Sequence, residues 1–267
     1  MLLTKHHGLG NDFLVLIDLD ESTPIDEDLA RSVCDRHRGV GAAGLIRVTR
    51  GSTNPFRMEL RNEDGTRAEM SGNGISCMAQ AIVMAGHAPD GVVAVDTDAG
   101  ERVVSVIDSD GPRRNRMRVA MGTPLLLGPL AEWEGERILR AVGVDVGNPH
   151  VVCHVADPDD APDLVALGER INASTPGGTN VELVTTGAAG SIVMSVYERG
   201  VGPTQACGTG AVAAAAAANS WGLAPKTMTV TQPGGDAEVE LGTPAHLTVP
   251  IEAIARIDWP NRAVGVA

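Results

Sequence analysis

Two short stretches of the chain join a small nucleophilic residue to a Gly-x-Gly turn. In MSGNGISC, residues 70–77, that residue is Ser71, and in QACGTGAVA, residues 205–213, it is Cys207. An apolar run follows each turn, which predicts that a helix begins there. A thiol is a far better acid–base group than a hydroxyl, so the two stretches combine one predicted geometry with two unequal chemistries.

The start of a helix can bind an anion. Its first backbone N–H groups have no partner within the helix, and the helix dipole adds positive potential. Such a start binds a carboxylate or phosphate and favours a thiolate, which lowers the pKa of a cysteine. Two starts facing one another would place an acid–base group on each face of one carbon. The plainer alternative is that small residues only permit close packing; two matched copies favour the catalytic interpretation.

Polar residues near the two copies stand among apolar ones and suit the recognition of an amino acid. An arginine can hold a carboxylate through two parallel hydrogen bonds, and amides can bind the remaining polar groups. Each also has a plainer interpretation, as a turn former, a surface ion pair or a satisfied core histidine. The candidates are Asn11, Asn62, Asn148, His150, Asn180, Glu198 and Arg199.

Landmarks around the two copies recur at a nearly constant offset. Ser71 and Cys207 are 136 positions apart, and so are Gly86 and Gly222, which end the predicted helices. Offsets of 135 to 137 also relate Gly10 to Gly147, Asp28 to Asp163, Gly44 to Asn180, and Asn62 to Glu198. An ordered set of this kind predicts a duplicated unit of about half the chain.

Each half combines strands, a short helix, more strands, the Gly-x-Gly turn and a long helix. The short helix of the first half is expected to begin after Asp26 and to be terminated by Gly39. The long helix is apolar nearly all round, so we expect a sheet to enclose it. The join between the two halves lies near the polar residues 108–116.

We predict an α+β fold of two similar, pseudo-twofold-related domains, each a β-sheet wrapped around a long central helix, with the active site in the interdomain cleft. The domains are residues 1–112 and 113–254, and a segment of about 255–267 returns to the first.

Composition narrows the possible functions. The 267 residues are 43% hydrophobic but only 2% aromatic, so an aliphatic core is expected. The net charge of −13 argues against nucleic-acid binding. Lysine occurs only at Lys5 and Lys226, which disfavours Schiff-base chemistry. The N-terminus has no signal-peptide pattern, and the uncharged stretch from Gly200 to Pro225 indicates a buried helix rather than a membrane span.

The four cysteines show no CxxC spacing. We therefore predict no metal site, no disulfide framework and a reducing cytoplasm. Cys207 alone precedes Gly-x-Gly and is expected to be the reactive thiol. The other three, in apolar surroundings, are expected to react slowly: Cys34, Cys77 and Cys153.

These motifs resemble the diaminopimelate epimerase family, in the cofactor-independent group of amino-acid racemases that includes proline racemase. The matching pieces span nearly the whole chain in family order: KHHGLGNDFLVL, RNEDGTRAEMSGNGISC, GNPHVV, GGTNVELV and YERGVGPTQACGTGA. The resemblance implies interconversion of LL- and meso-diaminopimelate by a cysteine pair acting as base and acid, in lysine and peptidoglycan-precursor biosynthesis. It implies no pyridoxal phosphate, no metal, a small-molecule amino-acid substrate and a homodimer.

The resemblance also assigns expected roles to residues. Cys207 falls on one catalytic cysteine and Ser71 on the other. Glu198 and His150 would support the bases and hold the reacting ammonium. The two helix starts would hold the reacting α-carboxylate with Gly72, Asn73, Gly208 and Thr209. The distal amino-acid end would meet Asn11, Asn62, Asn148, Asn180 and Arg199.

Three positions depart from the family pattern. Ser71 replaces a cysteine, Ala43 stands where an aspartate is usual, and Ser76 replaces the usual arginine before Cys77. Ala43 leaves the support of the substrate loop open. Ser71 leaves three explanations open: a natural serine–cysteine pair, an inactivating substitution, or a relative with another substrate or an elimination chemistry. The alternatives are therefore a racemase, epimerase or dehydratase for another amino acid, and a non-catalytic amino-acid-binding relative.

Overall fold

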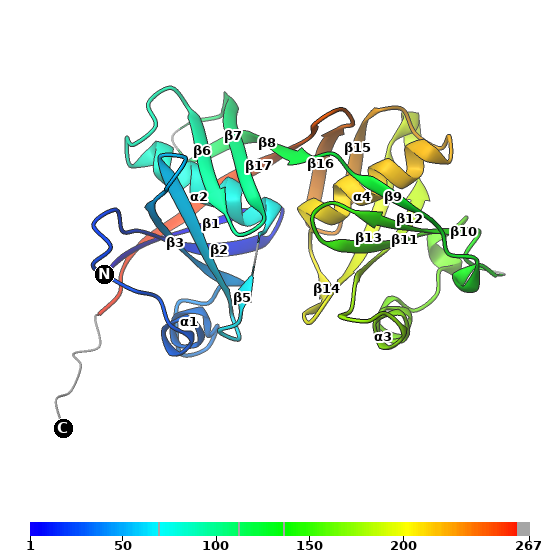
Figure 1. Cartoon of the computed structure of the whole chain (residues 1–267), viewed down its shortest axis with the longest axis horizontal. Helices are drawn as coiled ribbons and strands as arrows, with labels where there is room; N and C mark the ends of the chain where they lie inside the picture. The colour runs from blue at the N-terminus through cyan, green and yellow to red at the C-terminus, as the bar shows by residue number, and fades with distance from the viewer. Residues whose placement is uncertain (69, 112, 136, 261–267) are drawn as a thin grey trace.

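The computed structural model describes residues 1–260 except 69, 112 and 136. It consists of two similar lobes that lie side by side, each with a sheet around a central helix (Figure 1). This arrangement confirms the predicted α+β fold of two related halves.

The first half contains β1 (Leu2–Gly8), β2 (Asn11–Ile17), α1 (Glu27–Cys34), β3 (Gly44–Arg50), β4 (Phe56–Asn62), β5 (Arg67–Ala68), α2 (Gly72–Met84), β6 (Val92–Thr97) and β7 (Gly100–Ser109). The second contains β9 (Leu125–Pro129), β10 (Arg140–Asp145), β11 (Pro149–His154), α3 (Leu164–Ser174), β12 (Asn180–Thr186), β13 (Ile192–Glu198), β14 (Gly202–Thr204), α4 (Gly208–Ser220), β15 (Thr227–Gln232) and β16 (Gly235–Glu240). Two strands run between the halves, β8 (Arg114–Gly122) and β17 (Ala245–Asp258).

The strand pairings repeat at the offset seen in the sequence. β2 pairs in parallel with β3, which places Phe13 opposite Gly44. β11 pairs in parallel with β12, which places His150 opposite Asn180. The parallel pairs β4–β6 and β13–β15 correspond in the same way. Equivalent residues of the two halves can therefore be compared directly.

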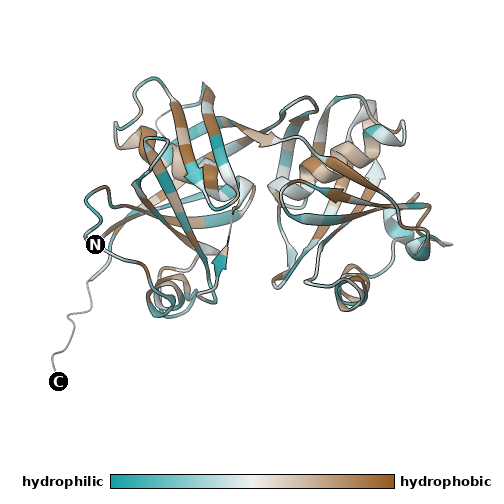
Figure 2. Cartoon of the chain, in the orientation of Figure 1, coloured by the Kyte–Doolittle hydropathy of each residue, from teal (hydrophilic) through white to brown (hydrophobic). Residues whose placement is uncertain are grey.

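The central helices α2 and α4 are enclosed by sheet. Every residue from Gly72 to Ile82 in α2 and from Gly208 to Ala218 in α4 is buried. Hydrophobic and hydrophilic residues alternate along the surrounding strands, so one face of each strand meets its helix (Figure 2). Gly86 and Gly222, with φ of 79° and 73°, follow the two helices in the left-handed conformation that ends a helix.

The short helix α1 begins as predicted and ends earlier. Asp26 caps it by accepting a hydrogen bond from the backbone N–H of Leu29 at 2.7 Å. The helix stops at Cys34, and the Asp35 carboxylate accepts from the backbone N–H groups of two following residues. Those bonds build a turn, which is why the helix does not continue to Gly39.

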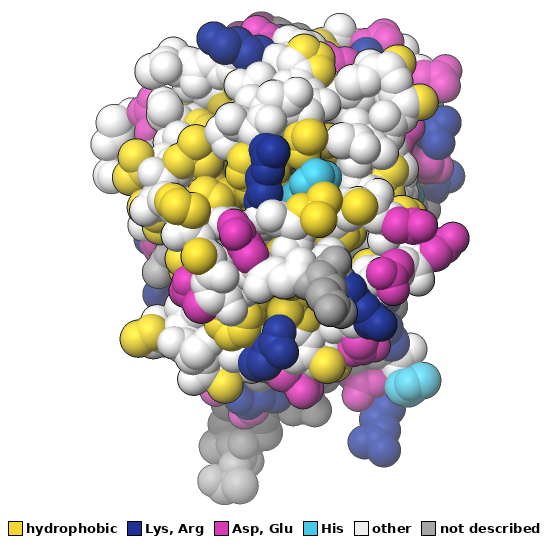
Figure 3. Space-filling model, turned by 90° about the vertical axis from the view of Figure 1, so that its right-hand side faces the viewer, with side chains coloured by type: hydrophobic (Ala, Val, Ile, Leu, Met, Phe, Trp, Pro, Cys, Tyr) yellow, Lys and Arg dark blue, Asp and Glu magenta, His cyan; other side chains and the backbone are white. Residues whose placement is uncertain are grey.

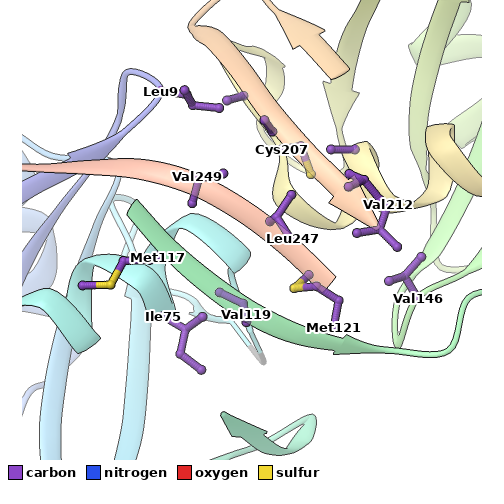
Figure 4. Close-up of a cluster of buried hydrophobic side chains, with 14 of the residues drawn as sticks. Leu9, Ile75, Met117, Val119, Met121, Val146, Cys207, Val212, Leu247 and Val249 are labelled. Atoms are coloured by element: carbon purple, nitrogen blue, oxygen red, sulfur yellow. The ribbon is translucent and has the colours of Figure 1, made fainter. Parts of the chain in front are cut away.

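The two crossing strands join the halves through a shared core. β8 pairs with β7 and with β17, while β17 pairs with β16 at one end and with β1 at the other. Met121 of β8 and Leu247 of β17 lie between the lobes, near Val212 of α4 (Figure 4). These strands hold the first turns of α2 and α4 in a single hydrophobic cluster.

The proposed domain division stays a prediction. Its boundary at residue 112 lies outside the described residues, as do residues 261–267 of the returning segment. Residues 255–258, the described strand residues of that segment, pair with Leu2–Lys5 of β1.

The outer end of the second half carries exposed hydrophobic groups. Hydrophobic side chains gather there among acidic and basic ones (Figure 3). On β9, which pairs with β10, the side chains of Leu125 and Leu127 are exposed. No helix among residues 1–260, with the three gaps noted above, is long and apolar enough to span a membrane.

Candidate active site in the cleft between the halves

A cleft of about 780 Å³ lies between the two halves. Both halves contribute to its walls, as the predicted pseudo-twofold arrangement requires. Of the residues singled out from the sequence, those that line it are Asn11, Asn62, Ser71, Gly72, Asn148, Asn180, Glu198, Arg199, Cys207, Gly208 and Thr209. Asn73 and His150 are buried and do not line it.

The starts of α2 and α4 touch one another in this cleft. A Cβ atom on Gly72 would stand 3.2 Å from the Cα of Gly208, and one on Gly208 would stand 3.1 Å from the Cα of Gly72. A side chain at either place would crowd the other helix, so glycine at both favours this approach. The positive ends of two helix dipoles therefore converge on one small space, which favours an anionic group there.

Ser71 and Cys207 occupy the same local position in the two halves. Both are the N-cap of their helix, with extended backbones at φ of −136° and −126°. The Ser71 hydroxyl accepts from the Gly74 N–H at 3.1 Å, and the Cys207 sulfur accepts from the Gly210 N–H at 3.3 Å. The predicted common geometry with unequal chemistry is thus present in the backbone and in the caps.

The electrostatics of Cys207 differ from the expectation. Burial raises the pKa of its thiol well above the usual value, and the charges of Glu198 and Glu182 raise it further. The Thr209 hydroxyl and the Gly210 N–H act in the opposite direction but are outweighed. The prediction that the helix start lowers this pKa is wrong, because desolvation and two carboxylates dominate.

Burial also raises the pKa values of the other three cysteine thiols, to about 12 for Cys34 and Cys153. Cys34 and Cys153 also face nearby carboxylates that add to the effect. All four cysteines are free thiols. Within the described part of the chain, no three His, Cys, Asp or Glu side chains are grouped to hold a metal ion.

Among the described carboxylates that line the cleft, Glu198 is the one whose pKa is raised. Burial raises its pKa, and the neighbouring charge of Glu182 adds to this, while a hydrogen bond from Thr204 lowers it. That bond runs from the Thr204 hydroxyl to Oε1 of Glu198 at 2.6 Å. A carboxyl group whose pKa lies closer to neutrality is better suited to exchange protons with a weakly acidic thiol.

His150 lies behind the cleft wall rather than in it. Its Nδ1 is 2.7 Å from Oε1 of Glu182, and its Nε2 is 3.0 Å from Oδ1 of Asn148. Asn148 in turn donates to the Thr209 hydroxyl at 3.4 Å. His150 therefore reaches the cleft through Asn148. It is thus a hydrogen-bonded core histidine that also contacts a wall residue, and its role as a support of the catalytic bases stays a prediction.

The asparagines of the cleft differ in their contacts. Asn11 and Asn73 of the first half both donate to the backbone carbonyl of Ala206 at 3.4 Å, just before Cys207. These bonds connect the first half to the segment that leads into α4. Asn62 donates to Thr66 of its own turn at 3.1 Å, in agreement with the turn-forming role considered for it.

Arg199 presents an exposed guanidinium to the cleft. Its backbone N–H donates to Oδ1 of Asn180 at 2.9 Å, and its Nη1 donates to the carbonyl of Gly177 at 3.3 Å. No carboxylate among the described residues lies within ion-pair distance of it, so it is not the surface partner of Glu198. The guanidinium can therefore take a ligand carboxylate in a two-bond grip.

Two positions that depart from the family pattern also lie close to the site. Ala43 lines the cleft, and its N–H bonds the Asp12 carboxylate at 3.1 Å. Ser76 is buried in α2 and donates to the carbonyl of Gly72 at 2.9 Å, so the hydroxyl serves the helix rather than the cleft.

Three further residues belong to the site and were not singled out from the sequence. Glu182 contacts His150, Gln232 accepts from the backbone N–H of Cys207 at 2.8 Å, and Arg102 of β7 lines the cleft. Glu182 could have been identified from the sequence, because an acid within the apolar strand NVELV needs a buried partner. The short sequences around Gln232 and Arg102 carry no such signal.

Comparisons with known proteins agree with this geometry. The family model described as diaminopimelate epimerase matches residues 3–127 and 142–252. The diaminopimelate epimerase of Mycobacterium ulcerans is 38% identical over 264 residues, covering 90% of each chain. That of Desulforudis audaxviator is 36% identical over 277 residues, covering 97% of this chain and 99% of the relative.

Solved structures show the same fold at low sequence identity. A probable proline racemase from Agrobacterium radiobacter K84 superposes with a TM-score of 0.75 at 19% identity, covering 99% of this chain and 94% of that one. A predicted epimerase from Pseudomonas aeruginosa gives 0.73 at 14% identity, covering 97% and 99%. With the fold shared and both sequence comparisons spanning most of its length, the chain belongs to the diaminopimelate epimerase family.

Proposed function

We propose that this protein is a diaminopimelate epimerase that interconverts LL- and meso-diaminopimelate without a cofactor, in lysine and peptidoglycan-precursor biosynthesis. The observation that carries the proposal is the contact of two helix starts, each capped by a residue able to exchange a proton. Membership of the family supports the substrate. A cytoplasmic location is predicted from the cysteine pattern, and a homodimer from the resemblance.

Substrate binding follows from the charges of the cleft. The α-carboxylate binds between the starts of α2 and α4, where unpaired N–H groups and two dipole ends favour it. The distal carboxylate binds Arg199, and the asparagines around it bind the distal ammonium. The negative charge that develops when the α-proton leaves is stabilised at the same helix starts.

Proton transfer uses the two capping residues. The Cys207 thiol first loses its proton to Glu198, and the thiolate then takes the α-proton from one face of the carbon. Ser71, or a water held by its hydroxyl, returns a proton to the opposite face. Solvent then replaces the proton lost on the Ser71 side, and Glu198 releases its extra proton to solvent. In the reverse direction the Ser71 side must accept the α-proton, which a hydroxyl does poorly. Proton exchange on the Cys207 face should therefore be faster than inversion.

The test is incubation with LL-diaminopimelate in deuterated water, followed over time by mass spectrometry and chiral chromatography. We expect α-deuterium to enter the substrate and meso-diaminopimelate to appear. L-lysine, which lacks the distal carboxylate, is the matched control and should exchange far more slowly. Absence of both deuterium uptake and inversion with diaminopimelate would overturn the proposal. Equal exchange with lysine would reassign the substrate.

A further inference from the structure

Glu182 is a buried carboxylate beneath the first turn of α4. Its side chain is fully buried, and Oε1 lies 2.7 Å from Nδ1 of the equally buried His150. A Cβ atom on Gly210 would stand 2.7 Å from Oε1, so the carboxylate lies directly against the helix backbone. Oε2 has no hydrogen-bond partner among the described residues. Burying such a group is unfavourable unless it is paired, so its presence calls for an explanation beyond packing.

The first half builds the same place from apolar residues. Ile46 stands at the position of Glu182 and Phe13 at that of His150, and both are buried. A Cβ atom on Gly74 would meet the Cδ1 of Ile46 at 3.4 Å. The fold is therefore complete with an apolar pair under the helix start. Because apolar pairs are often as stable as buried ion pairs, packing does not require Glu182.

A chain of hydrogen bonds connects Glu182 with the thiol. Because the Oδ1 of Asn148 only accepts, the Nε2 of His150 must carry the proton in their 3.0 Å contact. The amide nitrogen of Asn148 then faces the hydroxyl of Thr209 at 3.4 Å. That hydroxyl lies 3.4 Å from the sulfur of Cys207. The orientation of Asn148 thus depends on His150, and that of His150 depends on Glu182.

We propose that Glu182 is a positioning residue that engages Nδ1 of His150, keeps its Nε2–H directed at Asn148, and so holds the Asn148 amide and the Thr209 hydroxyl beside Cys207. The order of donors is the same whether the proton between Glu182 and His150 lies on the carboxyl or on the ring. Its kinetic consequence rests on the proposed function, but the hydrogen-bond order does not.

Two substitutions separate orientation from packing. Glu182→Leu keeps the approximate volume and removes the partner of Nδ1. Glu182→Gln keeps an amide that can bond to Nδ1 and therefore retains the Nε2–H of the ring. Ile46→Leu is the matched control at the equivalent place in the first half. Thermal unfolding of each variant establishes that it is folded.

The direct measurement is nitrogen-15 NMR of the His150 ring, with its signals assigned by their loss in His150→Gln. The parent and Glu182→Gln should show a protonated Nε2, and Glu182→Leu should show a mixture of tautomers. Ile46→Leu should leave the ring signals in place. An unchanged ring in Glu182→Leu overturns the proposal. If that variant does not fold, a ring protonated only at Nδ1 in Glu182→Gln overturns it instead.

Kinetics supply a second measurement. In Glu182→Leu the KM for diaminopimelate should rise about tenfold, as expected when one hydrogen bond to a charged ligand is misaligned, with a smaller rise in Glu182→Gln. Equal rises in both variants would show that charge, not orientation, matters, and would overturn the proposal. A parent inactive on diaminopimelate would refute the proposed function, while the ring signals would still decide the role of Glu182.

Discussion

The starts of α2 and α4 share a backbone but differ in what surrounds it. Each has an N-cap that accepts from the third residue of the helix, and each contributes one glycine to their mutual contact. Behind Cys207 lie His150 and Glu182, whereas the equivalent residues behind Ser71 are apolar. The duplicated backbone is therefore alike in both halves, whereas the buried histidine and carboxylate behind the N-cap belong to the second half.

The difference extends to the outer wall of the cleft. Glu198 and Arg199 of the second half correspond to Asn62 and Glu63 of the first, and all four line the cleft. Among the described cleft residues, the carboxyl with a raised pKa, Glu198, belongs to the second half, and the Arg199 guanidinium stands beside it in the sequence. Duplication supplied a symmetric frame, and side-chain substitution made its chemistry one-sided.

Cys207→Ser would make both helix starts alike and should have the largest effect. With a hydroxyl on each face, no good base remains, and epimerisation should fall by up to about 10⁴-fold, the upper range for a general acid–base group. The measurement is the LL-to-meso rate, with melting temperature as the check on folding. A folded variant that keeps more than about a tenth of the parent rate would show that the thiol is not the base.

Ser71→Cys would also make the helix starts alike, with a thiol at both N-caps. A thiol on the second face restores a group that can both give and accept a proton, so the LL-to-meso rate should rise by about 10²–10⁴-fold. The change is nearly isosteric, which limits its effect on packing. Rates of both proteins under identical conditions decide the matter. No gain over an already fast parent would mean that serine is a competent partner in this cleft.

Arg199→Lys tests the asymmetry of the outer wall. Lysine keeps the charge but cannot form two parallel bonds to a carboxylate, so diaminopimelate should bind more weakly by about 2 kcal/mol. Glu63→Gln, at the equivalent position of the first half, is the control and should change affinity much less. Titration calorimetry measures both, and unchanged affinity in Arg199→Lys would remove it from the binding site.

Gly208→Ala tests the contact that the two helix starts share. Its new methyl group would lie 2.9 Å from the Cδ2 of Leu247 and 3.1 Å from the Cα of Gly72, so the Leu247 side chain must move and the two helix starts must separate slightly. We expect a loss of about 1–3 kcal/mol in the free energy of unfolding, measured with urea. Gly135→Ala, where the methyl would meet nothing within 4 Å, should be nearly neutral. Similar losses in both variants would contradict the close contact.

The pH dependence of Cys207 alkylation should show the smallest effect. Because burial and two carboxylates raise its pKa well above 9, the thiolate fraction keeps increasing through pH 9, and the rate with iodoacetamide should rise about tenfold per pH unit without levelling off. The three cysteines outside the cleft should react more slowly throughout. Peptide mass spectrometry follows each site, and a plateau near neutral pH would contradict the raised pKa.

Much of the frame could be predicted from the sequence because duplication leaves a regular trace. The constant offset between Ser71 and Cys207 predicted two equivalent halves, and apolar residues all round a helix predicted its enclosure by sheet. Eleven of the residues singled out, some by these patterns and some by the family resemblance, line the cleft where the matched turns of the two halves meet. These features depend on local pattern and on symmetry, both of which a single sequence carries.

What the sequence could not provide depends on distant contacts. The pairing of β8 with β17 joins residues more than 120 positions apart, and no local pattern specifies it. The direction of the Cys207 pKa shift depends first on burial and then on the charges of Glu198 and Glu182, and neither the burial nor Glu182 could be recognised from its motif. His150 could be named but not placed, because its position behind Asn148 depends on the register of β11 and β12.

The contact between Gly72 and Gly208 also links ligand binding in the cleft to the stability of the junction between the two halves. Two like partial charges face each other there and repel at the junction of the halves. In the proposed binding mode, a carboxylate between them would neutralise that repulsion and act as a counter-ion shared by both lobes. At a hundred times its dissociation constant, a ligand that binds only the assembled pair adds about 2.7 kcal/mol of stability. In that binding mode the substrate would be a structural component of the junction as well as the molecule that reacts there.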